Sequence, residues 1–178
     1  MNICMFGASS STLHEDYYKG AADLGKEMAK RGHTLVFGGG NEGLMGSCVK
    51  ALDENGGYSI GIAPRFFDKP GILYENCSEF FFTDTMRQRK QMMEENSDAF
   101  IIVPGGIGTF EEFFEILTLK QLGRHNKPIA VFNIRNYYNN MVKMLKEASC
   151  EGFLKDTNLD LFSVFDNVSE LLNYVENY

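Results

Sequence analysis

The segment VPGGIGTFEE, Val103 to Glu112, places three glycines and a threonine directly before two carboxylates. Glycines at the start of a helix let several backbone N–H groups point toward one anion. The chain contains no GKS or GKT sequence, which would supply the lysine of a Mg-dependent triphosphatase. The segment therefore predicts a binding site for a monophosphate.

Glu111 and Glu112 follow this loop at once, although a carboxylate in that place would repel a phosphate. One interpretation is structural, because Thr109 and Glu112 have the spacing of a capping box, in which the threonine side chain accepts from the glutamate N–H. The other is catalytic, because a carboxylate one turn into the helix can stabilise positive charge on a substrate. The spacing alone leaves both interpretations open.

Three cations, Arg87, Arg89 and Lys90, lie in the helical pattern that precedes the strand feeding this loop. A solvated helix face is the simpler explanation, since exposed Lys and Arg are common and stabilise little. A guanidinium near the glycine loop would nevertheless offset the charge of the two glutamates. The cluster therefore favours a site that combines an arginine with a glutamate.

A second glycine-rich segment, GGGNEGLMG, contains the G-x-G-x-x-G pattern at Gly38, Gly40 and Gly43. In a dinucleotide-binding fold this pattern follows the first strand, and an acidic residue ends the next strand to hold a ribose hydroxyl. Here the pattern follows the second strand, and the next one ends in IAPR. NAD and FAD are therefore not expected, and the segment predicts a tight turn from strand to helix.

The elements that must position these residues alternate between strand and helix along the whole chain. Strands are expected at 2–9, 34–39, 58–64, 79–84, 98–106, 127–134 and near 161–166, and helices at 14–32, 43–57, 86–96, 109–123, 138–151 and 168–178. Nearly continuous apolar strands separated by helices predict a doubly wound, Rossmann-like α/β fold, with a mostly parallel sheet and helices on both faces. In such a fold the loops at 7–11, 38–43 and 104–109 converge beyond the carboxyl ends of the strands.

Length and composition set further bounds. The 178 residues predict one domain spanning 1–178, and a net charge of −7 argues against a nucleic-acid polymer or a membrane as partner. The amino-terminal segment lacks a basic leader, and no apolar run reaches the roughly 20 residues of a membrane span, so a cytoplasmic location is expected. Four scattered cysteines and three scattered histidines predict no metal site.

Several segments together resemble one family, the LOG (Lonely Guy) cytokinin-activating phosphoribohydrolases, which have also been labelled lysine decarboxylases. The similar segments are GGGNEGLMG, the M-x-x-R-K pattern at Met86, Arg89 and Lys90, SDAFIIVPGGIGTFEE, QLGRHNKPI and GF, and they extend from about the first strand to Phe153. Pyridoxal chemistry needs a Schiff-base lysine with supporting groups, and nothing in the sequence singles out such a set.

The resemblance implies hydrolysis of the N-glycosidic bond of AMP or an N6-substituted adenosine 5′-monophosphate, giving free base and ribose 5-phosphate. It implies no metal and no cofactor, and a homodimer with the site near the interface. Arg89 and Glu112 are the implied catalytic residues. The other expected ligand contacts are Ser9, Gly39, Gly40, Met86, Lys90, Gly105, Gly106, Ile107, Gly108, Thr109, Glu111 and Thr118. A non-catalytic nucleotide or phospho-ligand carrier on the same fold is the alternative.

Two departures from the family concern the base-binding side of the site. The family often has a tryptophan where this chain has Leu119, and the chain contains no tryptophan. The connection over 65–80 is only weakly similar, and a nucleotide-contacting glutamate of plant members would fall near Gly71, with Glu75 as a substitute. These departures bear on substrate preference rather than on the type of reaction.

Overall fold

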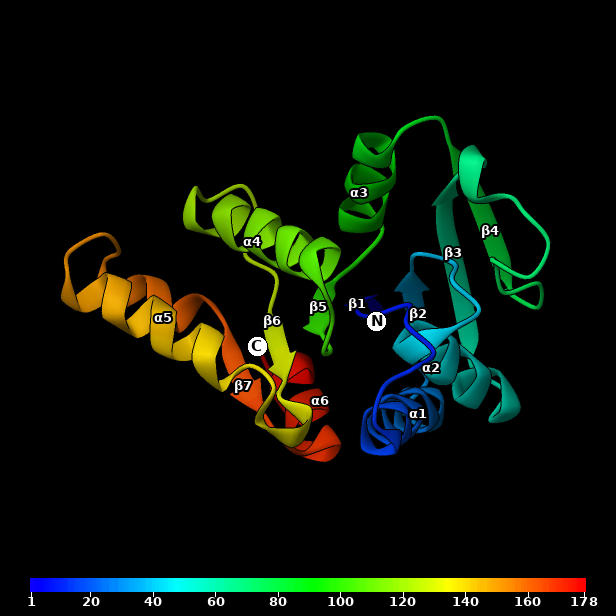
Figure 1. The fold of residues 1–178 in the computed structure, drawn as a ribbon, viewed down its shortest axis with the longest axis horizontal. Helices are drawn as coiled ribbons and strands as arrows, with labels where there is room; N and C mark the ends of the chain where they lie inside the picture. The colour runs from blue at the N-terminus through cyan, green and yellow to red at the C-terminus, as the bar shows by residue number, and fades with distance from the viewer.

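The computed structural model describes residues 1–178, and its seven strands form one sheet in the order β4-β3-β2-β1-β5-β6-β7 (Figure 1). Every neighbouring pair of strands is parallel. The strands are β1 (Asn2–Phe6), β2 (Thr34–Phe37), β3 (Tyr58–Pro64), β4 (Glu79–Thr83), β5 (Ala99–Ile102), β6 (Ile129–Phe132) and β7 (Ser163–Phe165). The predicted doubly wound α/β fold is confirmed, and the order of the strands reverses between β1 and β5.

Helices cover both faces of this sheet (Figure 1). The α-helices are α1 (Glu15–Lys30), α2 (Gly43–Glu54), α3 (Met86–Glu95), α4 (Ile107–Gln121), α5 (Asn139–Cys150) and α6 (Val168–Glu176). Three short 3-10 helices, η1 (Arg65–Phe67), η2 (Ile134–Asn136) and η3 (Asp156–Leu161), lie in the connections. One apolar cluster joins α1, α2 and α6 to the sheet, and a second joins α3, α4 and α5 to the opposite face.

The alternation of side chains in β1 shows how the strands serve both clusters. Ile3 and Met5 belong to the cluster under α1, α2 and α6, whereas Cys4 and Phe6 belong to the cluster under α3, α4 and α5. All four side chains are buried. A strand buried on both faces must be apolar at successive positions, which explains the continuous apolar runs of the sequence.

The expected elements are present, and most of the differences lie at their ends. The first strand ends at Phe6 instead of residue 9, and the helix expected over 43–57 ends at Glu54, because the chain turns at Asn55 and the left-handed Gly56. The helix expected over 109–123 begins two residues earlier, at Ile107. No helix is both long and apolar enough to cross a membrane.

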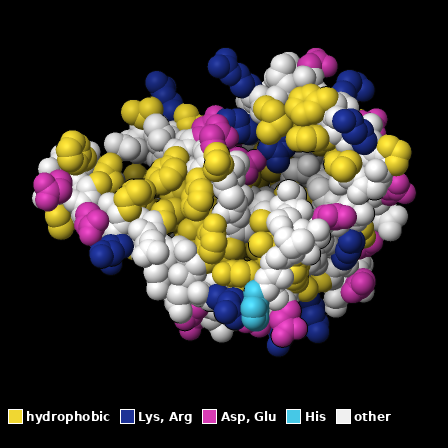
Figure 2. All heavy atoms as spheres, in the orientation of Figure 1, with side chains coloured by type: hydrophobic (Ala, Val, Ile, Leu, Met, Phe, Trp, Pro, Cys, Tyr) yellow, Lys and Arg dark blue, Asp and Glu magenta, His cyan; other side chains and the backbone are white.

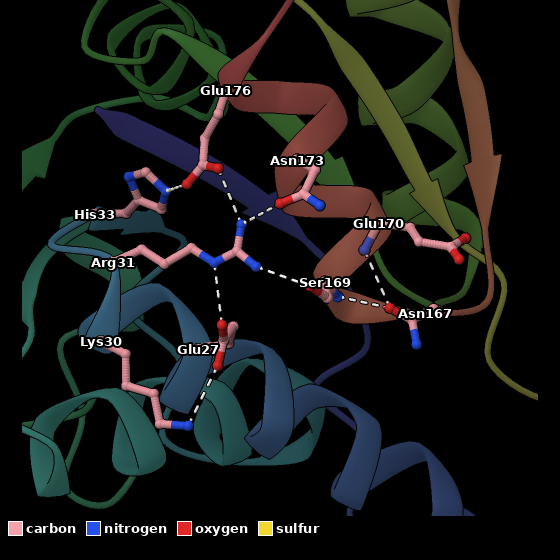
Figure 3. A network of polar contacts seen from close by, with 9 residues as sticks. All are labelled: Glu27, Lys30, Arg31, His33, Asn167, Ser169, Glu170, Asn173 and Glu176. Atoms are coloured by element: carbon pink, nitrogen blue, oxygen red, sulfur yellow. Dashed lines mark hydrogen bonds and ion pairs between the residues drawn. The ribbon is translucent and has the colours of Figure 1, made fainter.

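A polar network holds the carboxy-terminal helix α6 against the end of α1 (Figure 3). Arg31 Nη1 donates to Asn173 Oδ1 at 2.7 Å and to Glu176 Oε2 at 2.9 Å. Its Nη2 donates to Ser169 Oγ at 3.0 Å, and its Nε donates to Glu27 Oε1 at 3.1 Å. One guanidinium thus joins two helices that are distant in the sequence.

Candidate functional site

A cavity of about 590 Å³ opens where the strand order reverses, beyond the carboxyl ends of β1 and β5. Open parallel sheets bind ligands at this position. The loop after β1, the glycine loop after β2 and the segment that begins α4 all contribute to its wall. The three loops that the sequence predicted to converge therefore do so.

Arg89 and Glu112 form a buried ion pair in the wall of this cavity. Arg89 lies on α3 and is 7% exposed, and Glu112 lies on α4 and is 9% exposed. Arg89 Nη1 donates to Glu112 Oε1 at 2.7 Å, and Arg89 Nε donates to the Ile62 carbonyl at 3.3 Å. The guanidinium is therefore oriented from two sides before any ligand binds.

The position of Glu112 also changes its acidity. Burial raises the pKa of its carboxyl group, and the Arg89 guanidinium opposes that shift only in part. Arg89 also keeps the ionised form available, because a buried carboxylate without a cation would be far more costly. Catalytic carboxyl groups are frequently buried in a ligand-sized cavity and have a raised pKa.

The start of α4 does not contain the capping box that the spacing of Thr109 and Glu112 indicated. Gly106 is the N-cap residue, with φ −91° and ψ −155°, and no side chain caps the helix. Thr109 is therefore already inside the first turn, where it is buried and contributes to the cavity wall. The capping-box interpretation of Glu112 is wrong, since its carboxylate pairs with Arg89 instead.

Gly105 must be a glycine because of this packing. A Cβ atom on Gly105 would lie 2.1 Å from Thr109 Oγ1. Gly106 and Gly108 have open space where a Cβ would be, and both line the cavity. The loop thus combines one sterically required glycine with two that leave its backbone accessible to a ligand.

Two cations of α3, Arg89 and Lys90, neutralise three glutamates of α4. Lys90 Nζ pairs with Glu111 and Glu115, while Arg89 pairs with Glu112. Glu111 and Lys90 line a neighbouring depression outside the main cavity, together with Arg87. The predicted compensation of charge is present, but only Arg89 and Glu112 face the main cavity.

The second glycine loop shapes the site around Arg89. A Cβ atom on Gly38 would lie 2.2 Å from Arg89 Nη2, so the guanidinium needs the space that this glycine leaves. Gly43 adopts a left-handed φ of 66°, and a Cβ there would lie 2.3 Å from the Ala8 carbonyl oxygen. The G-x-G-x-x-G pattern therefore serves close packing, as the turn interpretation predicted.

An apolar strap crosses the other side of the cavity. Gly71, Ile72 and Leu73, from the connection between β3 and β4, line the cavity together with Phe67. An antiparallel bridge joins Leu73 to Gly40, so the strap is fastened to the glycine loop after β2. The sequence showed only that this connection is weakly similar to the LOG family. Its local pattern does not predict the long-range bridge to Gly40.

Known proteins resemble this chain in sequence and in fold. Residues 45–175 match the family model described as "Possible lysine decarboxylase". The cytokinin riboside 5′-monophosphate phosphoribohydrolase LOG5 of Arabidopsis thaliana is 39% identical over 176 residues, 99% of this chain and 77% of that protein. LOG3 of the same plant is 38% identical over 176 residues, 99% of this chain and 82% of that protein.

The chain belongs to the LOG family. In the solved structures, the molybdenum cofactor carrier protein of Chlamydomonas reinhardtii has a TM-score of 0.75 at 23% identity, with 99% of this chain and 96% of that chain covered. At this identity the likeness concerns the fold alone. The prediction of family and fold class from sequence is therefore confirmed.

The structure brings most of the residues expected from the LOG resemblance to one cavity. Those that line it are Ser9, Gly40, Met86, Arg89, Gly106, Gly108, Thr109 and Glu112. Four others lie outside both depressions: Gly39 packs under Phe80, Gly105 packs against Thr109, the side chain of Ile107 is 88% exposed, and Thr118 is exposed further along α4. Lys90 and Glu111 line the neighbouring depression.

Several lining residues were not among the expected contacts. They are Met5, Phe6, Gly7, Ala8, Gly38, Glu42, Met45, Phe67, Gly71, Ile72 and Leu73. Gly7, Ala8, Gly38 and Glu42 lie in the loops at 7–11 and 38–43 that were predicted to converge, although they were not expected as individual contacts. No lysine lines the cavity of this LOG-family chain, which argues against the Schiff base that pyridoxal-dependent decarboxylation requires.

Proposed function

We propose that this chain hydrolyses the N-glycosidic bond of a purine nucleoside 5′-monophosphate, with AMP or an N6-substituted AMP as substrate. The observation that carries this proposal is the Arg89–Glu112 pair in the wall of the same cavity as the glycine loop. The curated relatives named above support it, because they act on cytokinin riboside 5′-monophosphates. The products are the free base and ribose 5-phosphate.

The two parts of the site serve opposite ends of such a substrate. The first turn of α4 offers N–H groups and the positive end of the helix dipole to the 5′-phosphate. Glu112 lies one turn further along, where the ribose of a phosphate-anchored nucleotide would be. This separation explains why an anion-binding loop is followed by a carboxylate.

Glycosidic cleavage builds oxocarbenium-like positive charge on the ribose, and a carboxylate nearby stabilises it. In the proposed reaction the water oxygen bonds to C1′ as the bond from C1′ to the base nitrogen breaks. The electron pair of that bond goes to the base, which takes up the proton that water loses. Glu112 accepts and passes on this proton, and Arg89 orients Glu112 and the nucleotide.

The apolar part of the cavity supports a purine base as the leaving group. Met45, Phe67, Ile72, Leu73 and Met86 line this part, and none carries a charge. Apolar and sulfur-containing side chains pack well against the faces of an aromatic ring. The same surface can accept an apolar substituent on the adenine N6 atom, which leads to N6-isopentenyl AMP as the second substrate to test.

The reaction is tested by incubating the purified protein with AMP and N6-isopentenyl AMP and measuring free base and ribose 5-phosphate. We expect stoichiometric release of both products. Intact nucleotide after prolonged incubation with several purine and pyrimidine monophosphates, together with measurable binding, would leave the phospho-ligand carrier as the function. The same assay with lysine measures carbon dioxide release, which we expect to be absent.

We also infer that the chain forms a homodimer. Figure 2 shows hydrophobic side chains gathered over α4 and α5. The large exposed apolar residues in and around these helices are Ile107, Leu122, Tyr137, Met144 and Phe153. Ile107 borders the glycine loop, so a second copy on this surface would lie next to the cavity. Light scattering should give a molar mass of twice that of one chain. In the double variant Met144→Glu/Phe153→Glu, the molar mass should fall to that of a single chain.

A further inference from the structure

Two consecutive tyrosines, neither of which lines the cavity, bind backbone carbonyls of the glycine loop. Tyr137 Oη donates to the Gly105 carbonyl at 2.5 Å, and Tyr138 Oη donates to the Val103 carbonyl at 2.8 Å. Both residues lie between β6 and α5, about thirty residues further along the chain than the carbonyls that they bind. Neither was expected from the sequence to take part in the site.

The Tyr137 hydrogen bond determines where the next amide points. All peptide bonds in the chain are trans, so the Gly105 carbonyl and the Gly106 N–H point in opposite directions within one plane. Neither Tyr137 nor Gly105 lines the cavity, whereas Gly106 does. A Gly105 carbonyl drawn toward Tyr137 therefore leaves the Gly106 N–H, on the opposite side of the plane, directed toward the cavity. No acceptor in the chain takes this N–H.

The preceding peptide plane is held in the same way from another element. The Ala8 N–H donates to the Pro104 carbonyl at 3.1 Å, and the Gly105 N–H of that plane finds no acceptor in the chain. Three successive carbonyls, of Val103, Pro104 and Gly105, are therefore bound from outside the loop. The loop has its donors oriented before a ligand arrives, and such preorganisation is what strengthens anion binding.

The backbone before Tyr137 and the contacts of its ring fix the position of this residue. Arg135 and Asn136, directly before it, have left-handed φ values of 55° and 61°, and they are the only residues other than glycine with positive φ in the chain. Arg135 Nη1 also lies 2.5 Å from Asp16 Oδ2, with which it forms an ion pair. The Tyr137 ring stacks on the Phe110 ring, with 10° between the two ring planes. Strained backbone of this kind persists where the surrounding structure requires it and is concentrated at functional sites.

Tyr137 also remains a donor at neutral pH. Partial burial of the side chain, together with the nearby Tyr17, raises the pKa of its phenol above the ordinary value. A phenolate could not donate to a carbonyl oxygen, so this direction keeps the hydrogen bond to Gly105 intact.

We propose that Tyr137 is a positioning residue for phosphate binding, which acts through the Gly105–Gly106 peptide plane without touching the ligand. This inference rests on the proposed function only in that the glycine loop binds the 5′-phosphate. Tyr138 has a different role, because the plane that it holds ends in Pro104, which has no N–H to offer. Its hydroxyl fixes the end of β5 and serves stability.

The test compares binding of AMP, ribose 5-phosphate and adenosine to Tyr137→Phe by titration calorimetry. Phenylalanine keeps the ring stacked on Phe110 and removes only the hydroxyl. We expect AMP and ribose 5-phosphate to bind about 5- to 30-fold more weakly, as the loss of one well-placed hydrogen bond predicts. Adenosine, which has no phosphate, should bind within about twofold of wild type.

Two other hydroxyl deletions serve as controls. Tyr58→Phe removes a hydroxyl that bonds to Glu79 at the far edge of the sheet, and it should change none of the three affinities. Tyr138→Phe should lower the melting temperature while the ratio of AMP to adenosine affinity stays the same. Equal losses for AMP and adenosine in Tyr137→Phe, or no loss for either, would overturn the role assigned to Tyr137.

The outcomes also separate this inference from the proposed reaction. Wild-type protein that binds AMP but never cleaves it contradicts the hydrolase, and a selective loss of phosphate binding in Tyr137→Phe would still support the positioning role. Wild-type protein that cleaves AMP with the same KM in Tyr137→Phe contradicts the positioning role alone. Wild-type protein that binds neither AMP nor ribose 5-phosphate contradicts both.

Discussion

Arg89 Nη1 and Glu112 Oε1 lie 2.7 Å apart and join α3 to α4 within the cavity wall. In the sequence, α3 precedes β5 and α4 follows it, and both helices pack on the same face of the sheet. Each residue of the pair neutralises a charge that would be costly if buried alone. A substrate can therefore meet a carboxylate and a guanidinium that are already oriented.

Glu112→Gln is expected to abolish most of the turnover while it keeps the shape of the side chain. Loss of a positioned acid–base group lowers rates by about 10²- to 10⁴-fold. The measurement is kcat/KM for AMP, with AMP affinity determined separately. The matched control is Glu115→Gln, one turn further along α4, which pairs with Lys90 and should stay within about twofold of wild type. Full turnover by Glu112→Gln would refute the assigned role.

The pH dependence of kcat/KM should reflect the raised pKa of Glu112. Glu112 must be ionised to act, so activity falls as pH drops through its pKa in the folded protein. Burial raises that pKa, so the acid limb should lie above the ordinary glutamate range. Arg89 lowers the pKa, so Arg89→Ala should move the limb to still higher pH. An acid limb at lower pH in Arg89→Ala would contradict this electrostatic account.

The sequence was sufficient to predict the frame of the site. Apolar runs and helical periodicity located each strand and α-helix, and the rule for strand ends placed three loops together. The cations of α3 were expected to offset the glutamates of α4, and Arg89 and Lys90 do so. These features are predictable because each depends on a local pattern or on the general topology of a parallel sheet.

The parts that could not be predicted depend on long-range contacts. The position of Ile72 and Leu73 depends on the bridge from Leu73 to Gly40. The position of Tyr137 depends on the left-handed backbone of the two residues before it, which the identity of Tyr137 does not predict. The capping box failed for a different reason. Gly106, with its extended backbone, is the N-cap, so α4 begins at Ile107 and Thr109 lies inside the helix. Thr109 and Glu112 have the spacing of a capping box, but Thr109 does not occupy the N-cap position.

Substitutions at two glycines of the second loop should have different effects. In Gly38→Ala the new Cβ meets Arg89 Nη2, the end of a flexible side chain, so the protein should fold while the guanidinium is displaced. We expect kcat/KM to fall at least about tenfold, since a 1 Å displacement in an active site can cost more than that. A normal kcat/KM in folded Gly38→Ala would show that Arg89 need not lie where it does.

Gly43→Ala should instead impair folding. The left-handed φ of Gly43 costs any other residue about 1–2 kcal/mol, and the new Cβ would also press on the backbone oxygen of Ala8. Urea denaturation should therefore show a lower free energy of unfolding for Gly43→Ala than for Gly38→Ala. The reverse order would mean that the backbone contact at Ala8 relaxes more easily than the Arg89 side chain.

Arg31→Ala should destabilise the protein without changing the chemistry of the site. Arg31 binds Asn173, Ser169 and Glu176 of α6 from the end of α1, and its side chain is mostly buried. Loss of hydrogen bonds between a charged group and its partners should cost about 1.5–3 kcal/mol in the free energy of unfolding. The neighbouring Lys30→Ala is the control, because Lys30 forms only an exposed pair with Glu27 and should cost less than about 1 kcal/mol. Equal, small losses in the two variants, measured by urea denaturation, would show that apolar packing alone holds α6 in place.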